Sequence, residues 1–232
     1  NPALGNLTMV EMSGDDVGFG WNVGAFWTPS EATAVALSYR AETQLTLEGN
    51  IYSDLGVLNP DLGTLYNQGG SLDLNFAAIT ELAVDQKLDE KWSVQASVNY
   101  TDWSTFDKLE ANLDSGYDLL LKQEDFEDTW RLSAGVTYIM NDELTLRAGY
   151  AYDDGAVSRA HRSLSIPDTD RHWISAGATY SLTKDTSIDA AYVYIKGREA
   201  NVEQQRAIGP VETNLTATEH AKAHILSVQI NT

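Results

Sequence analysis

Apolar and polar residues alternate without interruption between residues 92 and 101. The even positions hold Trp92, Val94, Ala96, Val98 and Tyr100, and the odd positions hold Ser93, Gln95, Ser97, Asn99 and Thr101. Successive side chains of a β-strand point to opposite faces of its sheet. The pattern therefore predicts a strand with one apolar face and one polar face.

The same alternation recurs along the chain. It is found in the segments 19–27, 35–40, 72–76, 130–140, 144–152, 174–182, 188–194 and 226–231. Together with 92–101 these segments predict about nine strands, each long enough to belong to a sheet.

The connections between these segments alternate in length. Short turns are expected at 28–31, 87–90, 141–143 and 183–185, and long links at roughly 50–70, 115–128, 153–171 and 198–218. Short turns at one end and long loops at the other are typical of outer-membrane barrels. The pattern predicts an all-β fold, a transmembrane antiparallel β-barrel. A soluble β-sandwich is the alternative, but Arg40, Arg131 and Arg147 on the polar faces favour a wet lumen.

Aromatic residues gather near the predicted strand ends, as interfacial girdles require. They are Trp27, Trp92, Tyr138 and Tyr180 on the turn side, and Tyr39, Tyr100, Tyr152 and Tyr194 on the loop side. The formal net charge of −19 argues against nucleic acid or anionic lipid as a partner. No apolar run approaches the ~18 residues of a membrane-spanning helix.

An odd number of strands is awkward for a closed barrel. Single-chain bacterial barrels generally have an even count, and an open sheet leaves backbone groups that lipid cannot satisfy. We therefore expect residues 1–232 to be the C-terminal part of a larger, single β-barrel domain.

Several segments resemble a known family. They are 162–177 (RSLSIPDTDRHWISAG), 100–106 (YTDWSTF), 126–132 (FEDTWRL), 151–157 (AYDDGAV), 36–40 (ALSYR) and 18–22 (GFGWN). Taken in their order along the chain, they resemble the FadL-type outer-membrane transporters of long-chain fatty acids (the OmpP1/FadL/TodX family). The resemblance covers nearly the whole chain.

The resemblance implies a barrel of 14 strands, plugged by an N-terminal hatch. It places the predicted strands at the C-terminal end of that barrel, so the hatch and the first strands lie outside this sequence. It also implies a monomer in the outer membrane of a Gram-negative bacterium, surrounded by lipid and lipopolysaccharide, without a cofactor.

One ligand-binding residue is carried over by the resemblance. Lys122 matches a family lysine that is implicated in holding the fatty-acid carboxylate, and Leu120 and Leu121 beside it could line the start of an acyl slot. A carboxylate that leaves water needs a cation or several donors, which suits an ammonium group. The alternative is a solvated lysine paired with Glu124 or Asp125. Trp103 would lie on the polar face if the strand continues past Tyr100, as pocket wall or lumen packing.

Other charged residues allow more than one interpretation. Arg162, Asp168, Asp170 and Arg171 could lie near a ligand, but we expect ion pairs that brace the long connection. Arg131 and Arg147 could steer an anionic ligand or pair with acids of the hatch. Asp107, Glu110, Asp114 and Asp118 match no defined Ca²⁺ loop, so we expect solvated acids and no metal site.

The function expected from these features is passive, ligand-gated transport of long-chain fatty acids. Uptake of aromatic or other neutral hydrocarbons is one alternative, and a structural or surface-recognition barrel, such as a phage receptor, is another. An enzyme is not expected. His161, His172, His220 and His224 accompany no Gly-x-Ser-x-Gly elbow and no metal-ligand set.

Overall fold

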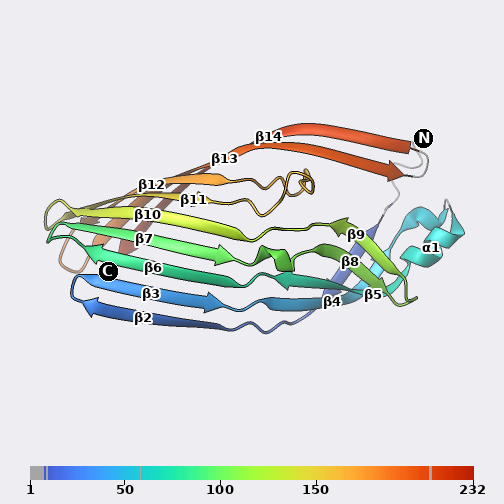
Figure 1. The fold of residues 1–232 in the computed structure, drawn as a ribbon, viewed down its shortest axis with the longest axis horizontal. Coiled ribbons are helices and arrows are strands. Elements are labelled where there is room, and N and C mark those ends of the chain that lie inside the picture. The colour runs from blue at the N-terminus through green and yellow to red at the C-terminus, as the bar shows by residue number, and fades with distance from the viewer. Residues whose placement is uncertain (1–7, 9, 58, 209–210) are drawn as a thin grey trace. The chain divides into compact units, whose positions relative to one another are not determined.

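The computed structural model describes residues 8, 10–57, 59–208 and 211–232, and these form fourteen strands in two open antiparallel sheets. Figure 1 shows the strands of each sheet side by side, for example β2 beside β3 and β6 beside β7. The chain divides into two compact units. The larger comprises Asn22–Ala41, Ala78–Trp103 and Phe126–Thr232, and the smaller comprises Glu42–Ala77, Ser104–Asp125 and the described residues up to Trp21.

The larger unit holds a nine-stranded sheet in the order β14-β13-β12-β11-β10-β7-β6-β3-β2. Its strands are β2 (Asn22–Ser30), β3 (Thr33–Arg40), β6 (Ile79–Lys87), β7 (Trp92–Thr101), β10 (Thr129–Ile139), β11 (Leu144–Asp153), β12 (Arg171–Ser181), β13 (Ser187–Ile208) and β14 (Val211–Asn231). The short η3 helix (Trp103–Thr105) follows β7.

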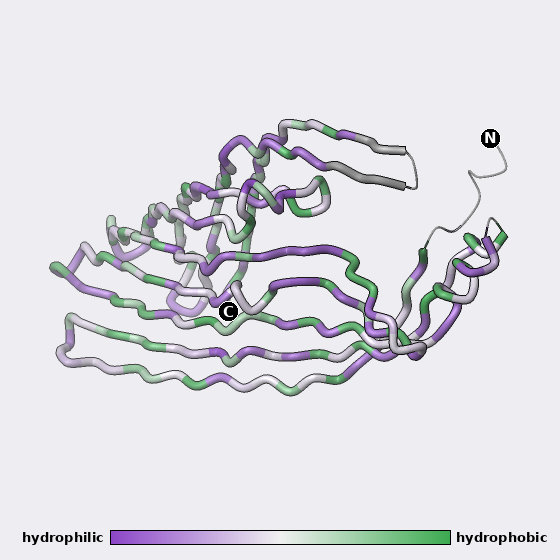
Figure 2. The backbone as a smooth tube through the Cα atoms, turned by 45° about the vertical axis from the view of Figure 1, so that its right-hand side comes forward, coloured by the Kyte–Doolittle hydropathy of each residue, from purple (hydrophilic) through white to green (hydrophobic). Residues whose placement is uncertain are grey.

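The segments of this sheet that the alternation predicted have the expected two faces, and Figure 2 shows apolar and polar residues alternating along the strands. The register places Val98 beside Leu82 and Leu132, and Ser97 beside Ala83 and Ser133. We call the face of Val98 the apolar face and that of Ser97 the polar face.

Large side chains on the apolar face are open to the surroundings. Leu132 is 50% exposed, Ile174 56% and Val228 65%. Apolar patches of this extent are rare on soluble monomers and mark contact with membrane or a partner.

Side chains close the short turns of this sheet. Asp89 accepts hydrogen bonds from the amides of Lys91 and Trp92, and Asn141 accepts from those of Glu143 and Leu144. Such side-chain-to-backbone bonds are the reason that Asp and Asn favour turns. The predicted aromatic clusters also form: Trp92 packs on Tyr138 at a centroid distance of 4.3 Å.

The smaller unit holds a five-stranded sheet in the order β1-β4-β5-β8-β9. Its strands are β1 (Glu11–Asp15), β4 (Thr43–Tyr52), β5 (Gln68–Phe76), β8 (Lys108–Leu113) and β9 (Asp118–Gln123). Its helices are η2 (Asp54–Val57) and α1 (Pro60–Tyr66), and Asn59 caps α1 by accepting from the amide of Asp61. A small core unites Ile51, Ala111 and Leu113 with Leu65, Tyr66 and Leu119.

The expectation of about nine strands is not confirmed. The segment 72–76 belongs to β5 of the smaller sheet, while β1, β4, β6, β8 and β9 were not predicted. The expected link 198–218 is largely strand, because β13 runs to Ile208 and β14 begins at Val211. The described residues form open sheets and no closed barrel. None of the helices in the described residues is long and apolar enough to cross a membrane.

Candidate ligand-binding site

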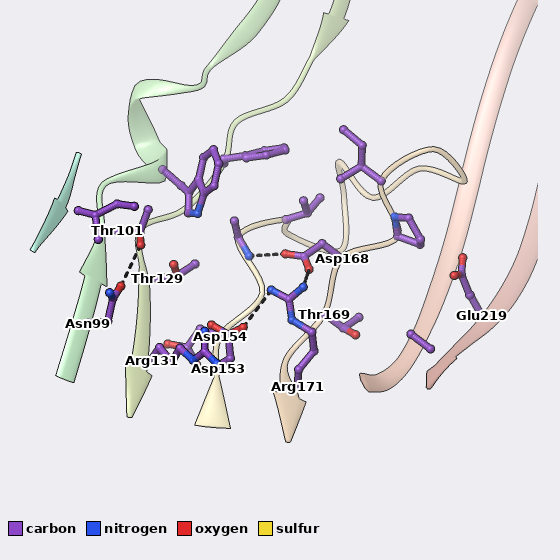
Figure 3. A pocket seen from close by; sticks show the side chains of 18 of the residues that line it. Asn99, Thr101, Thr129, Arg131, Asp153, Asp154, Asp168, Thr169, Arg171 and Glu219 are labelled. Carbon is purple, nitrogen blue, oxygen red and sulfur yellow. Dashed lines mark hydrogen bonds and ion pairs between the residues drawn. The ribbon is translucent and has the colours of Figure 1, made fainter. Parts of the chain in front are cut away.

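A cavity of about 660 Å³ lies on the polar face of the nine-stranded sheet, where β7, β10, β11 and β12 meet the long connections (Figure 3). Its volume is within the usual range of small-molecule sites, about 300–1,000 Å³. It is lined by Ile79, Asn99, Thr101, Trp103, Phe126, Thr129, Arg131, Asp153, Asp154, Ala156, Val157, Ser165, Ile166, Pro167, Asp168, Thr169, Arg171, Glu219 and Ala221.

A row of polar side chains crosses four strands beside this cavity. The register pairs Asn99 with Arg131, Arg131 with Asp153, and Asp153 with Arg171. Residues that are direct partners across antiparallel strands have Cα atoms about 4.5–5.5 Å apart. Two cationic groups and one carboxylate are thereby brought together from positions far apart in the sequence.

Arg171 ties the long connection 154–170 to the sheet. Its guanidinium lies 3.2 Å from Asp153 and 3.4 Å from Asp168. The carboxylate of Asp168 also accepts a hydrogen bond from the amide of Ala156 at 2.7 Å, and the carbonyl of Asp168 accepts one from Arg162 at 2.9 Å. The expected bracing network is confirmed for these residues, and the same network forms one wall of the cavity.

Asp170 extends this brace to β13. Its carboxylate lies 2.8 Å from the guanidinium of Arg198 and accepts from the amide of Gly155. Burial disfavours the charged form of Asp170, but these donors outweigh it and hold the pKa of Asp170 below its ordinary value.

Arg131 is different from Arg171, because no carboxylate oxygen of a described residue lies within 4.0 Å of its guanidinium. Its guanidinium carbon lies instead 4.4 Å from the centre of the Trp173 ring. Arg131 lines the cavity, so its guanidinium can donate to a ligand without first breaking an ion pair. This site therefore favours a ligand with acceptor oxygens.

The opposite part of the lining is apolar. The rings of Trp103 and Phe126 meet edge to face, with centroids 6.0 Å apart, and Val157, Ile166 and Pro167 continue the wall. Trp103 reaches this wall from η3, because β7 ends at Thr101 and does not continue as an unbroken strand. The cavity therefore combines an apolar wall with a guanidinium that has no ion-pair partner among the described residues.

Lys122 lies in the smaller unit, on β9. Its ammonium group lies 2.5 Å from the carboxylate of Glu124, whose side chain is completely buried, while that of Lys122 is 27% exposed. The other oxygen of Glu124 is buried and has no hydrogen-bond partner among the described residues. From the sequence, Glu124 and Asp125 were the two possible partners of Lys122, and the structure pairs it with Glu124.

The leucines before Lys122 have separate environments. Leu119 packs against the core of the smaller unit, while Leu120 is 53% exposed and Leu121 39% exposed. Leu121 has no register partner, because the pairing of β8 with β9 shifts between Leu109 and Glu110. Lys122, Leu120 and Leu121 thus belong to one unit and Trp103 to the other.

Of the other cavity residues, only Arg131, Asp168 and Arg171 were considered near a ligand from the sequence, each as one of two alternatives. Phe126 and Asp168 do lie within the segments that carry the family resemblance, which was the available signal. His172 and His224 lie elsewhere, on the apolar face, hydrogen-bonded to Tyr150 and Tyr192. Among the described residues, no group of three or more His, Cys, Asp or Glu is placed to hold a metal ion.

Comparisons with known proteins connect this chain to transporters. The family model described as outer membrane protein transport protein (OMPP1/FadL/TodX) matches residues 1–232. The long-chain fatty acid transport protein of Escherichia coli K12 is 36% identical over 176 residues, covering 73% of this chain and 40% of that protein. Outer membrane protein P1 of Haemophilus influenzae is 35% identical over 218 residues, covering 89% and 45%.

Solved structures agree in fold. A FadL homologue of Pseudomonas aeruginosa matches with a TM-score of 0.77 and 26% identity over 91% of this chain and 51% of that one. The toluene transporter TodX of P. putida matches with a TM-score of 0.61 and 17% identity, over 96% and 52%. The chain thus spans about 40–50% of the length of these relatives, which fits the expected C-terminal portion of a longer transporter.

These findings confirm the predicted location in the outer membrane of a Gram-negative bacterium. The family and these relatives are transporters or channels and not enzymes. The match over all 232 residues shows that the chain belongs to the OMPP1/FadL/TodX family of outer-membrane transport proteins.

Proposed function

We propose that the protein carrying this chain takes up long-chain fatty acids by passive, ligand-gated diffusion across the outer membrane. The observation that carries this proposal is the cavity itself, in which an apolar wall accompanies the guanidinium of Arg131, a cation with no ion-pair partner among the described residues. A fatty acid has both complementary parts, an acyl chain and a carboxylate. The relatives named as long-chain fatty acid transport proteins support the same substrate class.

The two parts of the ligand would be bound by different forces. Burial of the acyl chain against Trp103, Phe126 and Ile166 would contribute about 0.8 kcal/mol per methylene. The carboxylate would accept from the guanidinium of Arg131, since charge-assisted bonds are about twice as strong as neutral ones. No nucleotide or redox cofactor is needed for such a passage.

Lys122, Leu120 and Leu121 are proposed as a second contact region for the ligand, in line with the family resemblance. Leu120 and Leu121 are exposed and available to an acyl chain. Lys122 already has a carboxylate partner in Glu124, so a fatty acid would have to compete with Glu124 for the ammonium group. Release of the bound acid toward the periplasm, by movement of a hatch, is the remaining step of the proposed mechanism.

Uptake of neutral hydrocarbons is the second candidate, favoured by the apolar wall of the cavity. Such a ligand has no carboxylate, so its binding should depend on Trp103 and Phe126 but not on Arg131 or Lys122. A barrel that serves only for structure or surface recognition would show no saturable binding of either ligand.

The test is equilibrium binding of oleate and of toluene to the complete protein, folded in detergent as a monomer. Arg131→Gln is compared with Arg147→Gln, which removes the same charge from the same face but lies outside the cavity and donates to Thr179. We expect Arg131→Gln to weaken oleate binding about tenfold, or ~1.4 kcal/mol, and Arg147→Gln to leave it unchanged. Tight oleate binding that is indifferent to both Arg131 and Lys122 would contradict the carboxylate contacts.

A further inference from the structure

Three nitrogen-bearing side chains stand side by side on the apolar face, at its long-connection end. Lys196 of β13 is the direct partner of His172 on β12 and of Lys222 on β14. His172 is two residues from Ile174 on β12, and Lys222 is four residues from Leu226 on β14. Side chains an even number of residues apart on a strand share a face, so all three lie on the face that carries the exposed apolar residues. We call His172, Lys196 and Lys222 the basic row.

The two lysines of the basic row lack counter-ions. Among the described residues, no carboxylate oxygen lies within 4.0 Å of the ammonium group of Lys196 or of Lys222. Like charges directly opposite each other on a sheet are destabilising. The chain holds 34 acidic residues against 15 Lys and Arg. An anion from outside the described chain is therefore the natural partner of this row.

The position of the row along the strands indicates where that anion comes from. Along β13 the apolar face carries Ile188 and Ala190, then Tyr192 and Tyr194, and then Lys196. β14 repeats this order in the opposite direction, from Ile230, Val228 and Leu226 through His224 to Lys222. Hydrocarbon, aromatic interface and charged headgroup follow one another in the same order in a bilayer.

The spacing agrees with this sequence of layers. Eight residues separate Ile188 from Lys196, and a strand rises about 3.3 Å per residue, so they lie roughly 26 Å apart along β13. Tilting by about 40° reduces this to roughly 20 Å along the membrane normal, a few Å less than the apolar band of a barrel, which is about 25 Å tall. The long side chains of Lys196 and Lys222 span the difference, so their ammonium groups reach the level of the headgroups.

Neighbouring tyrosines fix the histidines of this region. The hydroxyl of Tyr150 lies 2.7 Å from Nδ1 of His172, and that of Tyr192 lies 2.7 Å from Nδ1 of His224. When the tyrosine donates to Nδ1, the ring hydrogen is on Nε2 and remains free to donate to an anion. The row thus offers two ammonium groups and an oriented imidazole donor.

The cluster is local to β12, β13 and β14. At the loop-side ends of β7 and β10 the tyrosine hydroxyl of Tyr100 donates to Asp128, so an acid occupies that region instead. Farther along β13, three residues beyond Lys196, the acid Glu199 is the register partner of His220, so the run of basic residues ends there. The general argument from net charge against an anionic lipid surface therefore does not apply at this place.

We propose that the basic row binds a phosphate group of the phosphorylated glycolipid in the outer leaflet, the lipid A part of lipopolysaccharide. The lipid phosphate would lie between Lys196 and Lys222, with His172 donating from β12, while its acyl chains cover Ile174 and Leu226. This site is on the face opposite the cavity and is independent of the proposed transport function.

The test measures binding of bisphosphorylated lipid A, in nonionic detergent micelles, to the complete folded protein. The neutral double variant Lys196→Gln/Lys222→Gln is compared with Lys87→Gln/Lys184→Gln, which removes two exposed lysines from the turn end of the same sheet. We expect at least a tenfold loss of affinity in the first variant, because each lysine near a lipid surface contributes to binding. The second variant should bind as the wild type does.

Further arms identify the source of the anion. Dephosphorylated lipid A should bind at least about tenfold more weakly than the bisphosphorylated form, and inorganic phosphate should not compete at equal concentration. Equal binding of phosphatidylglycerol would overturn the proposal for lipid A, as would equal loss in both lysine variants. Unchanged heat-modifiability on gels establishes that each variant is folded, and oleate binding should be the same in all of them.

Discussion

The ammonium group of Lys122 lies 2.5 Å from the completely buried carboxylate of Glu124. This pairing affects how the role of Lys122 must be tested. Removing the lysine alone leaves a buried carboxylate without a partner, and that costs about 3–5 kcal/mol, so a loss of binding could follow from local unfolding. Lys122→Met should therefore lower the stability of the β8–β9 hairpin as well as any affinity for oleate.

The double variant Lys122→Met/Glu124→Gln separates these effects, because it removes both charges of the pair. We expect it to recover most of the stability lost in Lys122→Met, as measured by urea unfolding. If Lys122 contacts the fatty-acid carboxylate, oleate affinity stays about tenfold below the wild type in the double variant. Recovery of both stability and affinity would show that Lys122 acts on folding only.

A second carboxyl group of this hairpin predicts a pH effect. A hydrogen bond with Asp125, together with burial and the charge of Asp125, raises the pKa of Asp107, which precedes β8 outside the nine-stranded sheet. The folded protein then holds this proton more tightly than the unfolded chain does. The resulting stabilisation is fully present below the ordinary aspartate pKa of about 3.9 and is lost as the pH rises through the raised pKa.

Amide hydrogen exchange can detect this loss locally. The amides of Glu124 and Asp125 both donate to the carbonyl of Asp107 at 2.8 Å, so their protection should fall as the pH rises from 4 to 7. Asp107→Asn should flatten this pH dependence, whereas Asp118→Asn, an exposed acid of the same hairpin, should retain it. An unchanged profile in Asp107→Asn would rule out the assignment.

Arg171 gives a prediction for the long connection 154–170. Its ion pairs with Asp153 and Asp168 join partly buried groups, whereas the pair of Arg159 with Glu203 is 73% and 68% exposed. Exposed pairs contribute about 0–1 kcal/mol, so Arg159→Ala should have little effect. Arg171→Ala should speed proteolysis within 154–170 severalfold, measured on the folded protein. Equal cleavage of both variants would mean that Arg171 does not hold this segment.

The two-faced strands could be predicted from the sequence because their alternation reflects two different surroundings. β6 was missed because its apolar face holds Thr80 and Gln86 beside Leu82 and Val84, while Ile79 falls on the polar face. The parts of β13 and β14 that lie within the expected link 198–218 were missed for a related reason. Beyond Ala200 the strand reads Asn-Val-Glu-Gln-Gln, without an apolar face that would identify it.

The candidate site was predictable only in part. The family resemblance identified Lys122 and the segments containing Trp103, Phe126 and Asp168. The contact of Arg131 with Trp173 depends on the register of β10, β11 and β12 together, which no local pattern specifies. The pairing of Lys196 with Lys222 depends in the same way on how the β13–β14 hairpin closes.

Two adjacent residues of β7 provide a direct test of which face meets lipid. Val98 lies on the apolar face beside Leu82 and Leu132, and Ser97 lies on the polar face, with its hydroxyl 2.7 Å from that of Ser133. A lysine on the lipid face near the bilayer midplane costs about 2–4 kcal/mol, whereas one facing a wet lumen costs much less. We therefore expect Val98→Lys to destabilise the folded protein in vesicles by about that amount, and Ser97→Lys to have a small effect. Urea titrations in lipid vesicles, followed by tryptophan fluorescence, measure both. Equal effects of the two substitutions, or a larger effect of Ser97→Lys, would show that the face of Val98 does not meet lipid.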